Sequence, residues 1–423
     1  MNKIDLKQII IDQKAEIDIL LKKHIIERTA VSFSELDMKN DLIKVIMGVR
    51  RSGKSVFSHL MLKGQLYGYI NFDDERLLGL KSDGLNDIYQ LILEIDPDVK
   101  AVIFDEIQNI KGWELFVNRL KRKGLQIIIT GSNSNLLSQE LATHLTGRHL
   151  SYEIFPFSFK EYLTYLNKGH LISSSLTTEQ KAQTINLLDQ YIQRGGFPET
   201  LGLDPVYLYL RELYDKLITR DIVTRYGLKN VSQLKNVALY LVSNFGNRFS
   251  YNRINNILEA KSVHTVQNYV DYLEQVYLAF QLKPFSFKVS ESVKHPRKTY
   301  CIDTGMIHAL APKTTLDSGR LMENIVFLEL KRRSKDIFFY PGKKGEIDFI
   351  VRNGTKIETL LQVCFDINDP QTYKRETRAL LAASTELSCG HLVMITRDER
   401  KDIKENERTI HCIPVWQWLL EKV

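Results

Sequence analysis

The sequence predicts an α/β protein in which a parallel sheet is covered by helices on both faces. Five short runs rich in β-branched and aromatic residues alternate with helical stretches, at residues 42–47, 67–72, 101–104, 126–130 and 149–155. Strands that alternate with helices pair in parallel, because each helix returns the chain to the same end of the sheet. The chain has 423 residues, which is too long for one compact unit, so we expect further domains after this sheet.

The composition is that of a soluble, folded protein. Hydrophobic residues make up 43% of the chain and charged residues 26%, and the net charge of +7 permits a polyanionic partner without requiring one. No run of about 18 apolar residues exists, so we expect no membrane span and a cytoplasmic location. The four cysteines are far apart and form no CxxC pair, which disfavours a zinc ribbon or a disulfide framework.

A glycine-rich loop follows the first strand. Residues 48–55 read GVRRSGKS, which fits the pattern GxxxxGK[ST], and helical sequence follows directly. In this context the backbone N–H groups cradle phosphates, the lysine reaches the β- and γ-phosphates, and the serine offers a ligand to Mg²⁺. The loop therefore predicts a site for ATP or ADP with Mg²⁺. The residues expected to bind the nucleotide are Gly48, Arg51, Ser52, Gly53, Lys54, Ser55 and Val56.

Two carboxylates, Asp105 and Glu106, follow the third strand. The carboxyl ends of parallel strands meet at one edge of a sheet, so we expect this pair to lie beside the glycine-rich loop. Asp105 is then expected to hold Mg²⁺ together with Ser55, and Glu106 to activate the attacking water. The alternative is an ordinary acidic turn after a strand.

Two further polar features lie at strand ends. The run 130–134 follows the fourth strand, and its side chains could sense the γ-phosphate, with a plain turn as the alternative. Arg148 precedes the fifth strand, where a cation could project into the nucleotide site of a neighbouring subunit and stabilise the transition state. A surface salt bridge is the alternative role for Arg148.

The order of the motifs resembles that of the AAA-type ATPases of bacteria and archaea that carry a C-terminal domain of unknown function. The segments that carry the resemblance are GVRRSGKS, YINFDDERL, VIFDEIQ, GWELFVNRL, ITGSNSNLL, LTGRHL, PFSFKEYL and RGGFPE. The resemblance implies an α/β fold: an AAA+ P-loop NTPase core with a five-stranded parallel sheet, a helical lid, a winged helix and a degenerate restriction-endonuclease-like PD-(D/E)XK domain. The implied parts are the core at 39–157, the lid at 158–229, the winged helix at 230–302 and the tail at 303–423, and the apolar spacing of residues 1–38 predicts a charged helical segment before them.

The resemblance also implies roles for single residues. Catalysis is assigned to Lys54, Glu106, Asn133 and Arg148, with Lys54 in Walker A, Glu106 in Walker B and Arg148 as the arginine finger. Asn133 or Ser132 is the sensor 1 residue. Pro198, in a glycine-proline element of the lid, could touch the adenine, or could belong to a loop that ends a helix. Arg194 and Arg220 are candidates for sensor 2, and the sequence does not choose between them.

Residues 250–302 read as two helices and two strands, which is typical of a helix-turn-helix with a wing. Ser262 is expected to cap the second helix and leave polar residues outward near its N-terminal end. Packing between ATPase subunits is the alternative use of such a module. The residues expected to contact DNA in this part are His264, Thr265, Gln267, Asn268, Lys294, Arg297 and Lys298.

The tail resembles a restriction-endonuclease fold with acidic residues at Glu323, Glu346 and Asp348 and a Gln362-Val363-Cys364 strand. Cleavage in that fold needs a lysine where Cys364 stands, and a thiol cannot supply its positive charge. We therefore expect a domain that does not cut DNA. Further residues expected to bind DNA, with a solvated face as the alternative, are Arg332, Arg333, Lys343 and Lys344.

These features favour an oligomeric AAA+ ATPase, expected as a hexameric ring, that couples ATP hydrolysis to the remodelling of branched or junction DNA such as a Holliday junction. The alternative is a STAND-like nucleotide-gated signalling or defence switch that acts on a protein partner. A third hypothesis, DNA cleavage, requires another lysine to replace the one missing at position 364.

Overall fold

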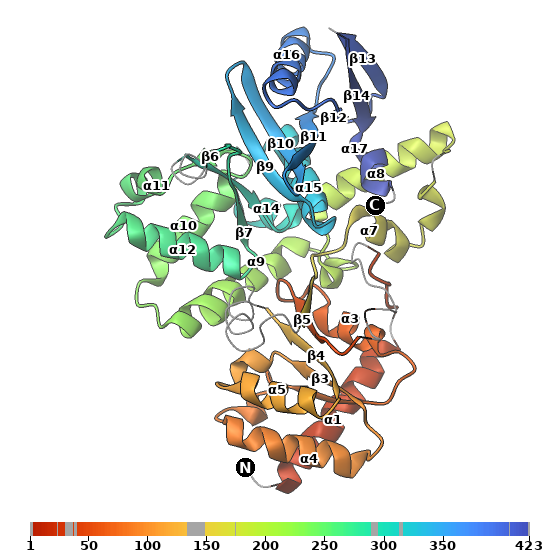
Figure 1. Ribbon diagram of the computed structural model, residues 1–423, viewed down its shortest axis with the longest axis vertical. Helices are drawn as coiled ribbons and strands as arrows, with labels where there is room; N and C mark the ends of the chain where they lie inside the picture. Colours follow the sequence, from red (N-terminus) through yellow and green to blue (C-terminus); the bar gives the residue numbers. More distant parts are fainter. Residues whose placement is uncertain are drawn as a thin grey trace. The chain divides into compact units, whose positions relative to one another are not determined.

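The computed structural model describes residues 3–22, 24–29, 37, 40–132, 149–173, 175–288, 295–312, 316–405 and 407–421. The chain forms two compact units, Met1–Phe155 and Pro156–Val423, and each is described by itself (Figure 1). The break lies two residues before the expected end of the core at 157, and the finer boundaries remain predictions. Within the described ranges, no helix has the length and apolar character needed to cross a membrane.

The first unit is built on a five-stranded parallel sheet, as the sequence predicts. Its strands, in the order β2-β3-β4-β1-β5, are β1 (Ile43–Met47), β2 (Tyr67–Asn71), β3 (Ala101–Asp105), β4 (Gln126–Gly131) and β5 (His149–Glu153). Every residue of β1 and β3 is buried, because helices cover both faces of the sheet. This burial explains why these strands read as continuous apolar runs.

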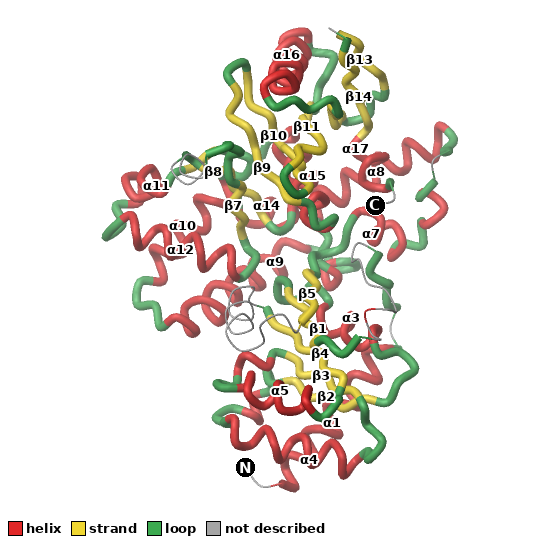
Figure 2. Tube along the Cα trace, in the orientation of Figure 1, coloured by secondary structure: helices red, strands yellow, loops and turns green. Residues whose placement is uncertain are grey.

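Helices cover the sheet on both sides (Figure 2). The helical elements of the first unit are α1 (Lys3–Leu21), α3 (Lys54–Met61), η1 (Glu75–Leu77), η2 (Ser82–Gly84), α4 (Leu85–Ile95), η3 (Ile107–Asn109) and α5 (Trp113–Arg122). Ile17 of α1 and Phe57 of α3 share one hydrophobic cluster with Ile103 of β3. The next residue, Phe104, faces the other side and packs on Phe116 of α5, with ring centroids 5.6 Å apart.

The N-terminal helix α1 is an integral part of the first unit. Its buried residue Gln13 forms backbone hydrogen bonds with the end of strand β2: Oε1 accepts from the Asn71 N–H at 2.8 Å, and Nε2 donates to the Asn71 carbonyl at 3.1 Å. The same amide donates to Asp74 at 2.8 Å. Gln13 therefore satisfies backbone groups at an edge of the sheet that has no strand beside it.

The second unit begins with helices, as expected for residues 158–229. These are α7 (Phe159–Tyr165), η4 (Gly169–Leu171), α8 (Thr178–Arg194), η5 (Pro198–Thr200), α9 (Val206–Lys216) and the π-helix η6 (Leu217–Thr224). Capping boxes begin α7 at Ser158 and α8 at Thr177.

Residues 250–302 contain the two helices and two strands that the sequence predicts, and a further helix and a short strand precede them. The elements of the range 230–302 are α10 (Val231–Ser243), α11 (Tyr251–Leu258), α12 (Val263–Gln275) and a sheet of order β6-β8-β7 made of β6 (Arg248–Phe249), β7 (Ala279–Leu282) and β8 (Arg297–Cys301). Ser262 caps α12, because its Oγ accepts a hydrogen bond from the Thr265 N–H at 3.1 Å.

The tail contains a mixed six-stranded sheet in the order β13-β14-β12-β11-β10-β9. Its elements are α14 (Thr304–Leu310), α15 (Ser318–Arg332), β9 (Asp336–Gly342), β10 (Gly345–Asn353), β11 (Lys356–Cys364), α16 (Pro370–Glu386), β12 (Leu392–Thr396), β13 (Lys401–Glu405), β14 (Arg408–Pro414) and α17 (Val415–Leu420). A hydrophobic cluster of buried residues joins α16 to β10, β11, β12 and β14.

Replacing Gln13 with alanine should destabilise the first unit. The Gln13→Ala variant loses both backbone bonds to Asn71, so the free energy of unfolding should fall by about 1–3 kcal/mol. Gln8→Ala is the matched control: Gln8 lies on the same helix but is exposed, so this change should stay within about 0.5 kcal/mol. Urea denaturation followed by circular dichroism measures both values, and equal effects would contradict the packing role of Gln13.

Candidate functional site

The loop from Gly48 to Gly53 connects β1 to α3, and its path requires glycine at both ends. A Cβ atom on Gly48 would lie 2.1 Å from the carbonyl oxygen of Ile154, which no side chain can occupy. Gly53 has φ = 94° and directly precedes the first turn of α3. The two glycines therefore let the backbone curl tightly at the N-terminal end of a helix, where N–H groups and the helix dipole favour an anion.

Lys54 and Ser52 lie inside this curl. The Lys54 side chain is 5% exposed, and its ammonium donates to the Val49 carbonyl at 3.2 Å and lies 3.6 Å from Oε1 of Glu106. The Ser52 hydroxyl is buried without a hydrogen-bond partner among the described residues. Because buried polar atoms are normally paired, this hydroxyl and the surrounding N–H groups fit a phosphate group.

Asp105 ends strand β3 and is almost fully buried. Its Oδ1 accepts a hydrogen bond from Thr130 Oγ1, and its Oδ2 accepts one from the Tyr69 hydroxyl at 3.2 Å. Burial, and next the charge of Glu106, raise the pKa of Asp105, whereas hydrogen bonds from Ser55 and Thr130 act in the opposite direction. Burial disfavours the ionised form of this carboxylate, and a cation bound beside it would stabilise that form. Asp105 is therefore suited as a ligand for a cation. The hydrogen bond from Ser55 shows that the two side chains are in contact. Asp105 and Ser55 therefore fit the two protein ligands of Mg²⁺.

Glu106 has a backbone in the left-handed region, with φ = 53°, and its N–H donates to Thr130 Oγ1 at 3.1 Å. Its Oε2 accepts hydrogen bonds from Gln108 at 2.5 Å and from the N–H and Oγ of Ser132 at 3.2 and 3.1 Å. Burial raises the pKa of Glu106, but the charges of Lys54 and Arg50 and these hydrogen bonds outweigh burial and lower it. Glu106 is therefore ionised at neutral pH and able to accept a proton.

Sequence reasoning missed Tyr69 and Arg28, and it included Thr130 only as a member of the run 130–134. Thr130 connects Asp105 with the backbone of Glu106, and Tyr69 contacts the other oxygen of Asp105. Arg28 donates to the carbonyls of Ser52 at 2.8 Å and Phe155 at 2.5 Å, and so fixes the outer side of the loop. Thr130 at least lies in the polar run that the sequence singled out, whereas no motif points to Tyr69 or Arg28.

The structure brings most of the predicted nucleotide-site residues of the first unit together. The loop, Asp105, Glu106 and Ser132 meet at the carboxyl ends of β1, β3 and β4, and Ser132 contacts Glu106 directly. Asn133 and Arg148 lie outside the described residues. Pro198 belongs to the second unit, where it begins η5.

Two of the predicted DNA contacts are contradicted by burial. Lys298 is 3% exposed, and its ammonium lies 2.7 Å from Oε1 of Glu323. Arg332 is 7% exposed and donates to the carbonyls of Pro156 and Phe157 at 3.2 and 3.4 Å. A buried cation with partners inside the protein cannot reach a phosphate, so these two predictions are wrong.

The other predicted DNA contacts differ in how accessible they are. Arg297 is half-buried and donates to the Tyr251 hydroxyl at 2.6 Å, and Arg333 is half-buried and donates to the Trp418 carbonyl at 2.8 Å. Lys294 lies outside the described residues. The predicted contacts that stay exposed or half-exposed are His264, Thr265, Gln267, Asn268, Lys343 and Lys344.

Comparison with known proteins supports the interpretation of the first unit. Residues 40–163 match the family described as "AAA domain". The chain belongs to the AAA-type P-loop ATPases. Residues 185–317 of this AAA-type ATPase match a domain of unknown function, DUF8612.

Relatives of this AAA-type ATPase extend over nearly its whole length. It is 34% identical to the uncharacterized protein MJ1544 of Methanocaldococcus jannaschii, over 99% of this chain and 96% of that protein, and belongs to the same family. An uncharacterized protein of Haemophilus influenzae is 36% identical over 77% of this chain and 83% of its own length. Among solved structures, the Walker-type ATPase paby2304 of Pyrococcus abyssi is 15% identical with a TM-score of 0.40, covering 65% of this chain and 93% of that one.

Thr130 should be a positioning residue for ATP hydrolysis. Thr130→Val keeps the shape of the side chain but removes the hydroxyl that contacts Asp105 and the Glu106 N–H, so kcat should fall by about tenfold to a hundredfold. Thr130→Ser retains the hydroxyl and should restore most of the rate. Steady-state ATP hydrolysis measures both variants, and a normal kcat in Thr130→Val would contradict this role.

Proposed function

We propose that this AAA-type ATPase hydrolyses ATP with Mg²⁺ and uses the energy to remodel DNA, with branched or junction DNA as the preferred substrate. The observation that carries the DNA assignment is the exposed polar first turn of α12, at the N-terminal end of a capped helix. We further propose that the protein acts in the cytoplasm, because its four cysteines are all free thiols.

The contacts of the first unit support a specific division of roles in hydrolysis. Lys54 and the loop N–H groups bind the phosphates, and Ser55 with Asp105 would hold Mg²⁺, which supplies positive charge to the phosphate oxygens when bound. Glu106 accepts the proton of the attacking water, and its hydrogen bonds to Gln108 and Ser132 fix the direction of its carboxylate.

Assembly into a ring of identical subunits, with a hexamer as the expected size, is the part of the proposal that rests on Arg148. The resemblance of LTGRHL to an arginine-finger motif supports a role for Arg148 in the site of the neighbouring subunit. Asn133 remains the alternative to Ser132 as the residue that senses the γ-phosphate.

The first turn of α12 offers the groups that read base edges and phosphates. His264 and Gln267 are exposed, and Asn268 hydrogen-bonds His264 through its amide at 3.2 Å. Ser262 holds the end of the helix, whose free N–H groups and positive dipole favour a phosphate. The buried face of α12, with Val266 among its residues, fixes these groups on the outside of the domain.

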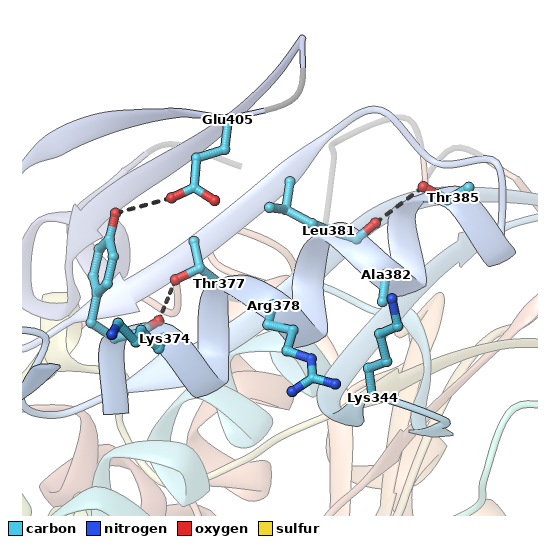
Figure 3. Close-up of a pocket in the computed structure, with 9 residues that line it drawn as sticks. Lys344, Lys374, Thr377, Arg378, Leu381, Ala382, Thr385 and Glu405 are labelled. Atoms are coloured by element: carbon cyan, nitrogen blue, oxygen red, sulfur yellow. Dashed lines mark hydrogen bonds between the residues drawn. The ribbon is translucent and has the colours of Figure 1, made fainter. Parts of the chain in front are cut away.

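A basic groove of about 390 Å³ on the tail supports phosphate binding at a second place (Figure 3). Lys374 and Arg378 project from α16, and Lys344 extends toward the same helix from the turn between β9 and β10. None of these three cations has a hydrogen bond or ion pair with another residue in the described part of the chain. The acidic residue that lines the groove, Glu405, accepts a hydrogen bond from Tyr373 at 3.5 Å.

Gel-shift titration tests this assignment. The double variants His264→Ala/Gln267→Ala and Lys374→Ala/Arg378→Ala should each weaken binding of a four-way junction by about tenfold or more at 100 mM salt. Only the second double variant removes positive side chains that would contact DNA phosphates. Only this variant should therefore reduce the slope of log Kd against log salt concentration, by about 2.

The matched control is Lys229→Ala/Lys356→Ala, which removes two exposed lysines outside both surfaces and should leave the Kd unchanged within about twofold. An equal loss of binding in Lys229→Ala/Lys356→Ala and Lys374→Ala/Arg378→Ala, with no loss in His264→Ala/Gln267→Ala, would show that net charge alone attracts DNA. Wild-type protein that shifts no DNA at low salt would contradict the proposal.

A further inference from the structure

The second unit contains a buried lysine that contacts three carboxylates at once. Nζ of Lys298, on strand β8, lies 2.7 Å from Oε1 of Glu323, 2.7 Å from Oε1 of Glu346 and 2.9 Å from Oδ1 of Asp348. The Lys298 residue is 3% exposed. The three acids, which we call the carboxylate cluster, come from α15 and β10 of the tail, where the endonuclease resemblance predicts metal ligands.

The carboxylate cluster encloses the ammonium of Lys298. Nζ donates hydrogen bonds to Glu323 and Asp348, and Glu346 forms an ion pair with it at 2.7 Å. Because Lys298 is buried among these acids, its ammonium is not accessible to a phosphate. Lys298 lies among the acids of the endonuclease-like site, but it does not take over the catalytic role of the lysine that Cys364 replaces.

Other residues around the carboxylate cluster are committed to contacts within the protein. The Tyr300 hydroxyl donates to Oε1 of Glu323 at 2.6 Å, and the Val363 N–H donates to Oδ2 of Asp348 at 3.0 Å. Gln362 accepts from the Asp348 N–H at 3.2 Å and donates to Glu376 at 2.6 Å. The glutamine that would be a metal ligand in this fold is thus directed to Glu376.

We propose that Lys298 is the resident cation of the carboxylate cluster and takes the place of a divalent metal ion, so that the tail is held together by an internal ion-pair cluster and does not cut DNA. The inference does not rest on the proposed function, because it concerns contacts within the second unit alone. It also accounts for the position of Lys298: the ammonium connects strand β8 to the tail, which begins after that strand.

The charges around the carboxylate cluster fit a single internal cation. Burial, and next the charge of Asp348, raise the pKa of Glu323 above its ordinary value. Arg248 forms an ion pair with Glu346 and neutralises part of the negative charge of the cluster. In the described part of the chain, Lys298, Arg248 and Tyr300 contact the cluster, and Glu376 and Arg375 of α16 interact electrostatically with Asp348. Burial raises the pKa of the Tyr300 hydroxyl, which stays neutral.

Manganese binding tests the proposal on the full chain. Calorimetric titration of the nucleotide-free wild type with MnCl₂ should show no binding that depends on Asp348, so wild type and Asp348→Asn should give the same isotherm. Lys298→Met removes the internal cation and should create a site with at least about tenfold tighter Mn²⁺ binding than wild type. Lys298→Met/Asp348→Asn should lose that site, and Lys356→Met, which changes an exposed lysine of the tail, should behave as wild type.

Two outcomes would overturn the proposal directly. One is Mn²⁺ binding, or Mn²⁺-dependent nicking of supercoiled plasmid, that wild type shows and Asp348→Asn lacks. The other is a folded Lys298→Met protein without a new Mn²⁺ site. If Lys298→Met does not fold, the comparison of wild type with Asp348→Asn decides the question by itself.

Discussion

The parallel pairing of β1, β3 and β4 is the constraint on which the nucleotide site depends. These neighbouring strands end at the same edge of the sheet, so the glycine-rich loop, the acidic pair and Ser132 meet although more than 70 residues separate the first from the last. The hydroxyl of Thr130 then links β4 to β3, because it donates to Asp105 and accepts from the Glu106 N–H. The alignment of Asp105 and Glu106 thus depends on a side chain of the neighbouring strand.

Two buried lysines differ in how many carboxylates surround them, and this difference distinguishes a lysine that can bind a ligand from one that only forms contacts within the protein. Lys54 donates to the Val49 carbonyl and lies 3.6 Å from Glu106, which leaves donor capacity among the described residues for a phosphate. Lys298 forms ion pairs with three carboxylates, which enclose its ammonium. Both charges are buried, and both are stabilised only because carboxylates lie beside them. Lys54 is therefore suited to bind a phosphate, whereas Lys298 occupies the position that a divalent metal ion would take.

The sequence predicts the first unit well because its signals are local. Apolar runs mark the five strands to within two residues at each end, and the pattern from Gly48 to Ser55 needs no tertiary information. The errors concern cations whose partners are distant in sequence: Lys298 contacts Asp348, 50 residues away, and Arg332 contacts the Pro156 carbonyl, 176 residues away. A cluster of basic residues in a sequence does not reveal such partners, so burial of these cations could not be predicted.

The proposed function couples ATP hydrolysis by Glu106 and its neighbours to DNA. The most direct test is the rate of ATP hydrolysis with Mg²⁺ in the absence of DNA, with linear duplex and with a four-way junction. We expect the wild-type rate to rise with DNA and to rise most with the junction. Glu106→Gln should bind ATP with a Kd near that of wild type and hydrolyse it at least about 10²-fold more slowly under every condition. A wild-type rate indifferent to all DNA would contradict the coupling, and normal hydrolysis by Glu106→Gln would contradict the assignment of the base.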